Sequence, residues 1–253
     1  MEWPGLLPTD PSLSASRCRT IHSLDRAIKD CDACPRLVRW REDVAVTKRR
    51  AYIDHEYWGK PVTGFGPADA KIVIIGLAPG AHGANRTGRV FTGDSSGDWL
   101  YGSLFRNGLA KREFSIDRHD GQELIDTRIT CAVRCAPPEN KPSRDEIAEC
   151  EPWLTREFEL LQPSARAYLA LGQLAWRSTI ASLRALDEEL PRKLPKFGHG
   201  ASFKFRGKDG QARLVIASYH PSQQNTFTGK LTRSALDSVV RKAGRFAHAS
   251  SPL

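Results

Sequence analysis

The sequence lacks any long apolar run. No stretch among its 253 residues approaches the roughly 18 uninterrupted apolar residues that a membrane helix needs. Residues 1–20 also lack a basic segment followed by an apolar one, so they do not read as a secretory signal. We therefore expect a cytoplasmic protein that does not contact a membrane. With 40% hydrophobic and 26% charged residues, the composition is typical of a globular protein.

Acidic residues are in the minority. Lys and Arg number 38 against 29 Asp and Glu, which gives a formal net charge of +9. A well-solvated surface explains such an excess, and so does a polyanionic partner such as DNA, whose phosphates are neutralised by Lys and Arg. The charge alone does not decide between them.

Three common motifs are missing from the most unusual loop of the chain. The apolar run KIVIIG (71–76) leads into GLAPGAHGANRTGRVFTGDSSGDWL (76–100), a segment rich in glycine. It does not match the phosphate-binding G-x-x-x-x-G-K-[ST], the dinucleotide G-x-G-x-x-G or the nucleophile elbow G-x-S-x-G. What it does offer is one acid near its far end, Asp94, and one aromatic ring, Phe91.

Four short apolar runs predict the fold. They are KIVIIGLA (71–78), TRITCAVRC (127–135), ARAYLALG (165–172) and RLVIASYH (213–220), and helical patterns such as 144–161, capped at Ser143, lie between them. Strands alternating with helices indicate an α/β fold, with a parallel sheet covered on both faces. We expect residues 1–20 to form an extended arm, residues 21–253 to form a single domain, and a helix over 231–247 to close it.

In such sheets, ligands bind beyond the carboxyl ends of the strands. The glycine-rich loop lies at one such end, and HPSQQNTFTGKLT (220–232) lies at another. Asp94, Phe91, His220 and Asn225 together suit a heteroaromatic ring, such as a nucleobase turned out of its stack. Simpler interpretations remain for each: Asp94 as a helix cap, Phe91 as core, and His220 and Asn225 as turn residues.

The six cysteines are Cys18, Cys31, Cys34, Cys131, Cys135 and Cys150. Cysteines in a reducing compartment rarely form disulfides. The C-x-x-C pair at 31–34, with the wider pair Cys135 and Cys150, can supply four thiolates to zinc or to an iron–sulfur cluster. Buried apolar cysteine is the alternative, and it fits Cys18 and Cys131.

The two loops resemble motifs one and two of the uracil-DNA glycosylase superfamily. The string A-x-R-T-G-R-x-F-T-G-D (84–94) is the form found in family 5, whereas family 4 has an acidic residue where this chain has Leu77. The resemblance spans about 30 to 240 and includes the C-x-x-C, CAPPENKP (135–142) and Cys150. It implies a three-layer α/β/α fold on a central four-stranded parallel sheet.

The resemblance also implies a 4Fe–4S cluster on Cys31, Cys34, Cys135 and Cys150, with zinc as the alternative. It assigns roles to three groups of residues. Asp94, Asn140 and His220 are the expected catalytic residues, and Gly76, Leu77, Ala78, Phe91, Gln224 and Asn225 are expected to contact base or DNA. Within the last group, Gln224 or a neighbour would be the wedge that fills the space left by the flipped nucleotide.

The implied function is that of a monofunctional DNA glycosylase of base-excision repair that acts as a monomer. Its substrate would be DNA containing uracil, and also hypoxanthine or other deaminated or damaged bases, because Leu77 leaves fewer polar groups to demand uracil. No lysine lies inside either motif to form a Schiff base, so strand cleavage is not expected. A catalytically weak damage-binding module of the same fold is the alternative, and an unrelated iron–sulfur or zinc redox protein is a third.

Overall fold

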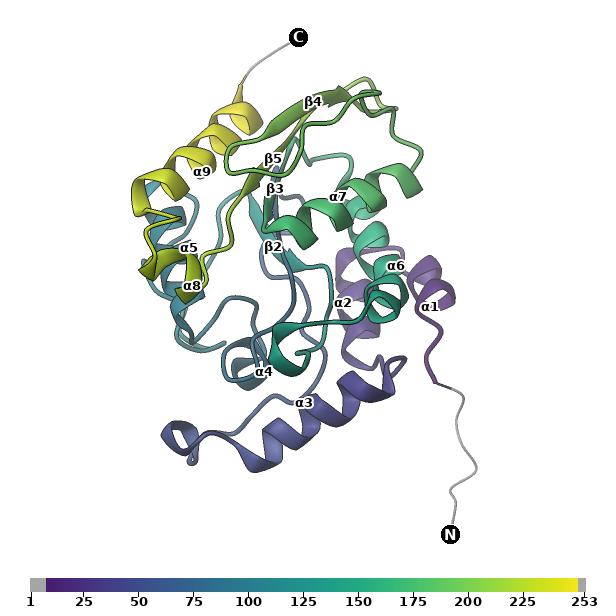
Figure 1. Ribbon diagram of the computed structural model, residues 1–253. Helices are drawn as coiled ribbons and strands as arrows, with labels where there is room; N and C mark the ends of the chain where they lie inside the picture. The colour runs from purple at the N-terminus through teal and green to yellow at the C-terminus, as the bar shows by residue number, and fades with distance from the viewer. Residues whose placement is uncertain (1–7, 250–253) are drawn as a thin grey trace.

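The computed structural model describes residues 8–249 (Figure 1). Within these residues, three helices precede the first strand, and helices separate the parallel strands that follow; two 3-10 turns, η1 (Arg50–Tyr52) and η2 (Pro138–Asn140), lie between these elements. The strands are β1 (Ile72–Gly76), β2 (Thr127–Cys131), β3 (Ala167–Leu171), β4 (Ser202–Arg206) and β5 (Ala212–Ser218). The helices are α1 (Pro11–Arg17), α2 (Ile21–Lys29), α3 (Pro35–Thr47), α4 (Ala84–Thr87), α5 (Ser95–Arg106), α6 (Arg144–Leu161), α7 (Gln173–Ala185), α8 (Gln223–Phe227) and α9 (Arg233–His248).

The sheet confirms the predicted parallel core and adds one strand. Its order is β2-β1-β3-β5-β4, and the four parallel strands are the four apolar runs of the sequence. β4 pairs antiparallel with β5 at the edge, a strand that the prediction missed. Its sequence SFKFR alternates buried and exposed residues instead of forming an apolar run, because helices do not cover both faces of this edge strand.

The sheet separates two apolar layers, as a three-layer α/β/α fold requires. On β1, Ile72 and Ile74 pack with residues of α5 and α9, whereas Val73 and Ile75 pack with residues of α6 and α7. Figure 1 shows these helices on opposite sides of the sheet. Successive strand residues point to opposite faces, so a fully buried strand reads as continuous apolar sequence.

The extended arm predicted for residues 1–20 is wrong where the structure describes it. Residues 11–17 form helix α1, which has Pro11 at its first position and is capped by Asp10, whose carboxylate accepts from the amide of Leu13 at 3.0 Å. Ala15 is buried against the cluster that contains Trp153 of α6. Residues 1–7 lie outside the described part of the chain. Over residues 8–249, no helix is both long and apolar enough to cross a membrane.

Candidate active site

A cleft of about 910 Å³ lies beyond the carboxyl ends of the parallel strands. The loops after β1, β2, β3 and β5 all contribute to it, as the strand-end rule predicts. The structure brings eight of the nine predicted catalytic and base-contacting residues to its lining, namely Leu77, Ala78, Phe91, Asp94, Asn140, His220, Gln224 and Asn225. The ninth, Gly76, lies behind the lining, where a Cβ atom would stand 2.7 Å from the Phe91 ring.

Asp94 is both the cap of α5 and a wall of the cleft. Its Oδ1 accepts a hydrogen bond from the amide of Gly97 at 2.9 Å, while its Oδ2 lies against Gly80 and Gly83. Burial raises the pKa of this carboxyl above its ordinary value, although the Gly97 amide acts in the opposite direction. The cap therefore fixes one oxygen and leaves the other aimed at the glycine loop.

Phe91 and His220 place two neighbouring rings in the lining of the cleft. Their centroids lie 5.7 Å apart with an interplanar angle of 31°. Phe91 is 8% exposed and has φ 52°, a left-handed conformation that is rare for an aromatic residue and that turns its ring toward β1. Burial lowers the pKa of His220 to about 4, so the imidazole is neutral at neutral pH and able to donate a hydrogen bond.

Asn225 and Gln224 lie on α8, and they play different parts. The Nδ2 of Asn225 donates to the backbone oxygen of His220 at 2.9 Å, so its amide braces the loop, as the turn interpretation expects. Gln224 is exposed at the cleft rim. One turn further on, Phe227 is 81% exposed and offers an apolar side chain at the same rim helix.

Asn140 reaches the cleft from a strained turn. It ends η2, is exposed, and has φ 57° next to Glu139 at φ 53°. Asparagine tolerates the left-handed region better than most residues, since its short amide can bond locally. Two successive residues with positive φ strain the backbone, and strain of this kind is typical of functional sites.

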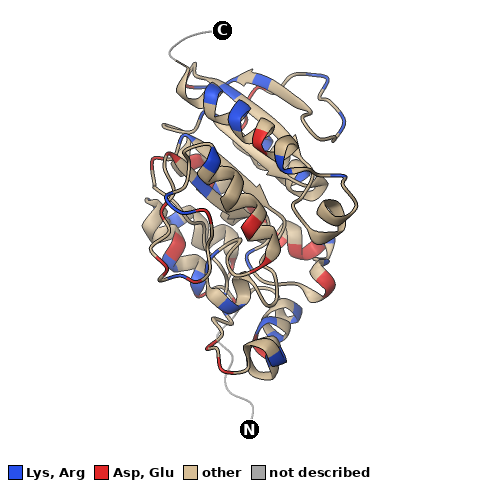
Figure 2. Cartoon of the chain, turned by 90° about the vertical axis from the view of Figure 1, so that its left-hand side faces the viewer, with Lys and Arg blue, Asp and Glu red and all other residues tan. Residues whose placement is uncertain are grey.

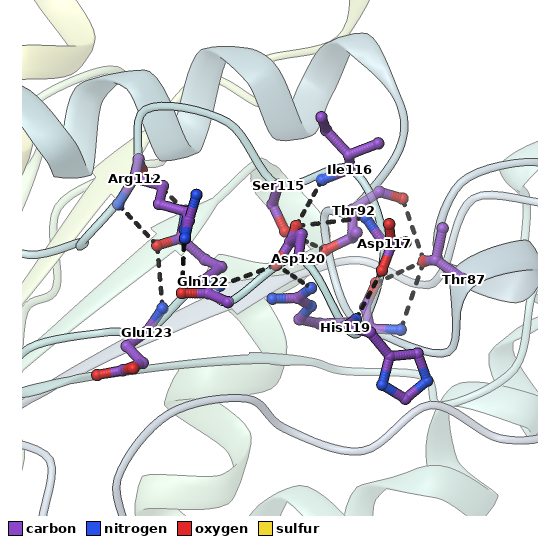
Figure 3. A network of polar contacts seen from close by, with 12 residues as sticks. Thr87, Thr92, Arg112, Ser115, Ile116, Asp117, His119, Asp120, Gln122 and Glu123 are labelled. Atoms are coloured by element: carbon purple, nitrogen blue, oxygen red, sulfur yellow. Dashed lines mark hydrogen bonds and ion pairs between the residues drawn. The ribbon is translucent and has the colours of Figure 1, made fainter.

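The glycine-rich loop is held in place by buried polar contacts (Figure 3). Arg89 pairs with Asp120 at 2.7 Å, and both side chains are almost fully buried. The hydroxyls of Thr92 and Ser115 are 2.8 Å apart, and the Gly93 amide donates to the Ser115 oxygen at 2.9 Å. The segment 112–123 thus fixes the backbone on both sides of Phe91.

Sequence reasoning missed several residues of this wall. Arg86 donates from Nη2 to the oxygen of Gly93 at 2.9 Å and stacks over the ring of Tyr52. His82 lines the cleft and contacts the hydroxyl of Tyr57 at 3.1 Å. Arg86 and His82 stand inside the loop motif itself, whereas Tyr52 comes from a segment that has no motif of its own.

The four cysteines of the predicted metal site line one small cavity. Cys31 and Cys34 come from the turn between α2 and α3, Cys135 follows β2, and Cys150 lies in α6. Arg41 donates from Nη1 to Cys135 Sγ at 2.9 Å, and the Arg134 amide donates to Cys150 Sγ at 3.3 Å. Within residues 8–249, however, no three His, Cys, Asp or Glu side chains converge closely enough to hold a single metal ion.

The cysteine cavity and the cleft share a wall. The amides of Ala132 and Val133 donate to the oxygens of Gly76 and Leu77 at 3.0 and 2.9 Å, and Cys135 follows two residues later. The backbone that positions the start of the glycine loop is therefore continuous with the cysteine site.

Comparison with known proteins agrees with these features. Residues 63–243 match the model of the uracil DNA glycosylase superfamily. The chain is 49% identical over 228 residues to a type-5 uracil-DNA glycosylase of Mycobacterium leprae, covering 90% of this chain and 96% of that protein. It is 45% identical to the type-5 enzyme of Thermus thermophilus (86% and 94% covered), but 30% identical to a type-4 enzyme of Pyrobaculum aerophilum (80% and 83%).

Proposed function

Because the chain belongs to the uracil-DNA glycosylase superfamily, and within it to the type-5 group, we propose that it hydrolyses the N-glycosidic bond of uracil in DNA and so starts base-excision repair. The observation that carries the proposal is the cleft, which places the buried Asp94 carboxylate and the neutral His220 ring around one space. That space is large enough for a nucleobase that has been flipped out of the duplex.

The reaction needs opposite charges stabilised at two ends of one bond. Cleavage leaves positive charge on the sugar and negative charge on the departing base. Asp94 faces the sugar and stabilises the oxocarbenium ion while its free Oδ2 orients or deprotonates water. His220 donates a hydrogen bond to the base oxygen as charge develops there, and Asn140 helps to hold the water.

Phe91 supplies the stacking surface for the flipped base, a contact worth roughly 1–3 kcal/mol on the scale measured for single bases. Gly76 lets this ring lie against the end of β1. On the rim, Gln224 or Phe227 of α8 fills the space that the nucleotide leaves. A polar Gln224 would bond to the orphaned partner base, and an apolar Phe227 would insert between base steps.

Substrate choice extends beyond uracil. Leu77 lines the cleft with an apolar side chain where family 4 has an acid, so fewer polar groups select among bases. Hypoxanthine and other deaminated or damaged bases are therefore substrates as well. Lys141 and Lys230 also line the cleft, but Lys141 lies 3.1 Å from Glu139 with both side chains mostly exposed. A buried, desolvated lysine suited to a Schiff base is absent from this lining, so the enzyme acts as a monofunctional glycosylase.

A 4Fe–4S cluster is the group that suits the four cysteines. Tetrahedral zinc needs sulfurs about 3.8 Å apart, and no single-ion site of that kind forms among the described residues. Cys31, Cys34, Cys135 and Cys150 instead surround a common cavity whose N–H donors, from Arg41 and Arg134, point at sulfur. Bound there, the cluster would serve as a structural cross-link with the electron-transfer capacity of iron–sulfur groups, and the residues of the cleft carry the hydrolysis.

Base release from labelled duplexes tests the proposal. Duplexes carrying uracil, hypoxanthine or thymine are incubated with the cluster-loaded protein and then treated with alkali. Uracil and hypoxanthine strands should break only after alkali. The change Asp94→Asn should lower the single-turnover rate by roughly 10²–10⁴-fold, whereas Asp69→Asn, at an exposed acid outside the cleft, should leave it within about twofold.

The other possible results identify the alternatives. Binding to damaged duplexes without base release would support a damage-binding module of the same fold. A strict preference for uracil would contradict the role given to Leu77, and strand breaks without alkali would contradict the monofunctional mechanism.

A further inference from the structure

A second basic site lies away from the cleft, in a groove between α9 and the edge strand β4. The groove has a volume of about 440 Å³. Four cationic side chains line it, Lys204 from β4 and Arg241, Lys242 and Arg245 from α9, over a floor that includes Leu214 and Phe246. In Figure 2, blue segments recur along the helix nearest the C-terminus, which is α9.

Among the four groove cations, only Arg241 has an acid nearby in the described part of the chain, Asp237 one turn before it on α9, and that carboxylate is already paired with Arg106. Over residues 8–249, none of the four cations forms an ion pair with a carboxylate, and no acidic residue lines the groove. Asp237, the acid nearest along α9, is held by Arg106 through two hydrogen bonds of 2.9 Å. Lys242 donates only to the Ser202 hydroxyl, at 2.8 Å.

Leaving these cations together costs the helix stability. Arg241 and Arg245 stand four residues apart on α9, a spacing at which like charges repel on a helix surface. Lys204 approaches the same space from the strand, 5.5 Å above the Phe246 ring. All four side chains are exposed, so they are accessible to an external anion. A bound anion would relieve their mutual repulsion.

The position of the groove indicates what kind of anion. Lys204 pairs in register with Leu214 on β5, and His220 follows six residues later along the same strand and its exit loop. At about 3.3 Å per residue, the groove is about 20 Å from the catalytic histidine. Two further exposed cations lie closer to the cleft: Lys230 lines it, and Arg233 is the first residue of α9. About six nucleotides of one DNA strand span such a distance.

We propose that the groove between α9 and β4 binds the phosphate backbone of the substrate DNA about six nucleotides from the base in the cleft. This inference rests on the proposed function, since it takes DNA as the substrate. The groove would not read sequence or lesion. It would lengthen the footprint and hold the enzyme on undamaged DNA through contacts that depend on salt.

The test compares two triple variants on two lengths of DNA. The groove variant carries Arg241→Gln, Lys242→Gln and Arg245→Gln, and glutamine keeps the helix propensity of α9. The control variant carries Arg17→Gln, Arg19→Gln and Arg26→Gln, three exposed cations at α1 and α2 on the other side of the molecule in Figure 1. Both lose the same charge. Circular dichroism on heating checks that both remain folded.

Binding is measured by fluorescence anisotropy over a range of KCl concentrations, with a 40-bp duplex and a 9-bp duplex that each carry a central uracil. The 9-bp duplex extends only about 14 Å to either side of the lesion. For the groove variant, the slope of log K against log[KCl] should become shallower by about 2 to 3 on the long duplex only. Single-turnover uracil release at saturating enzyme should stay within about twofold of the unchanged protein on both lengths.

Three results would overturn the proposal. The groove variant could match the control variant on the long duplex, or it could lose affinity equally on both lengths. A labelled deca-glutamate peptide could also bind the unchanged protein and not the groove variant while duplex binding stays the same, which would make the groove a site for an acidic protein. Failure of the unchanged protein to release uracil from either duplex would instead contradict the proposed function.

Discussion

The ring of His220 stays neutral in the cleft because it is buried. Burial lowers its pKa to about 4 from an ordinary value of 6.5. Above pH 6.5, the folded and unfolded chains both carry a neutral ring, so the shift has no effect on stability. Between pH 6.5 and about 4, the unfolded chain takes up a proton that the folded chain does not, and the free energy of unfolding falls. Below about pH 4 this loss is complete.

Replacing the ring should therefore change how stability depends on pH. Between pH 7.5 and pH 4.5, we expect the free energy of unfolding to fall by about 2 kcal/mol less in His220→Gln than in the unchanged protein, because glutamine has no proton to gain. Urea unfolding followed by fluorescence at several pH values measures this difference. Parallel curves for the two proteins would mean that the ring is already free to titrate in the folded chain.

Gly83 leaves room for the carboxylate of Asp94. A Cβ atom built there would overlap Oδ2 of Asp94, the oxygen that the helix cap leaves free. We expect Gly83→Ala to displace this oxygen and to slow uracil release at least tenfold. A matched control is Gly198→Ala, where a Cβ atom meets nothing within 4 Å. Single-turnover rates of both variants decide the matter, and equal rates would show that Oδ2 does not act from this position.

At the scale of elements, the segment 112–123 acts as a brace for the glycine-rich loop (Figure 3). Burial by itself raises the pKa of Asp120. The amides of Gln122 and Ile116 and the guanidinium of Arg89 lower it by more, so the net pKa lies below the ordinary value. The carboxylate is thus ionised and paired with a buried cation. Removing it leaves the Arg89 charge without its partner, which is costly in a buried site.

We expect Asp120→Ala to lower the free energy of unfolding by about 3–5 kcal/mol. Asp120→Asn should recover part of this loss, since it keeps the shape and one acceptor for Arg89. The exposed Asp117, whose carboxylate caps the amide of His119, provides the control Asp117→Ala, with an expected change below about 1 kcal/mol. Urea denaturation measures all three. A loss for Asp120→Ala as small as that for the control would exclude a bracing role.

The elements that sequence could predict are those whose signal is local. The four parallel strands appeared as apolar runs because both faces of each are covered. β4 has one covered face and did not stand out, although the Gly207–Gly210 turn before β5 was a hairpin signal. Asp10 followed by Pro11 is likewise a helix-start signal for α1, but the proline and serine content of residues 1–20 favoured an extended arm.

The same distinction applies to the cleft. Asp94 and His220 could be placed together because each follows a strand of one parallel sheet. The ion pair between Arg89 and Asp120 could not be predicted, since Asp120 lies 31 residues after Arg89 in a segment that has no motif. The bond from Asn225 to the His220 oxygen needed the folded turn itself, because an asparagine five residues after a histidine serves a pocket or a turn equally well.

At the scale of the whole molecule, the cysteine site joins the N-terminal helices to the sheet. Cys31 and Cys34 lie between α2 and α3, whereas Cys135 follows β2 of the sheet and Cys150 lies in α6. A cluster bound by all four would cross-link these parts. Without it, α3 keeps the buried side chains of Leu37 and Val44 and the paired hydrogen bonds from Arg36 to Glu146. Opening of α3 would then be local, because the sheet and its covering helices have cores of their own.

We therefore expect Cys34→Ser to abolish the iron–sulfur absorbance of the purified protein and to speed trypsin cleavage at Arg36 and Arg41 by about tenfold, while residues 63–243 stay intact. The control is Cys18→Ser, since serine can keep the hydrogen bond that the Cys18 thiol donates to the Ser14 oxygen. Mass spectrometry of timed digests locates each cut. Equal digestion of the two variants would mean that packing of α3, and not the cluster, holds the N-terminal helices in place, and absorbance that survives in Cys34→Ser would remove Cys34 from the ligand set.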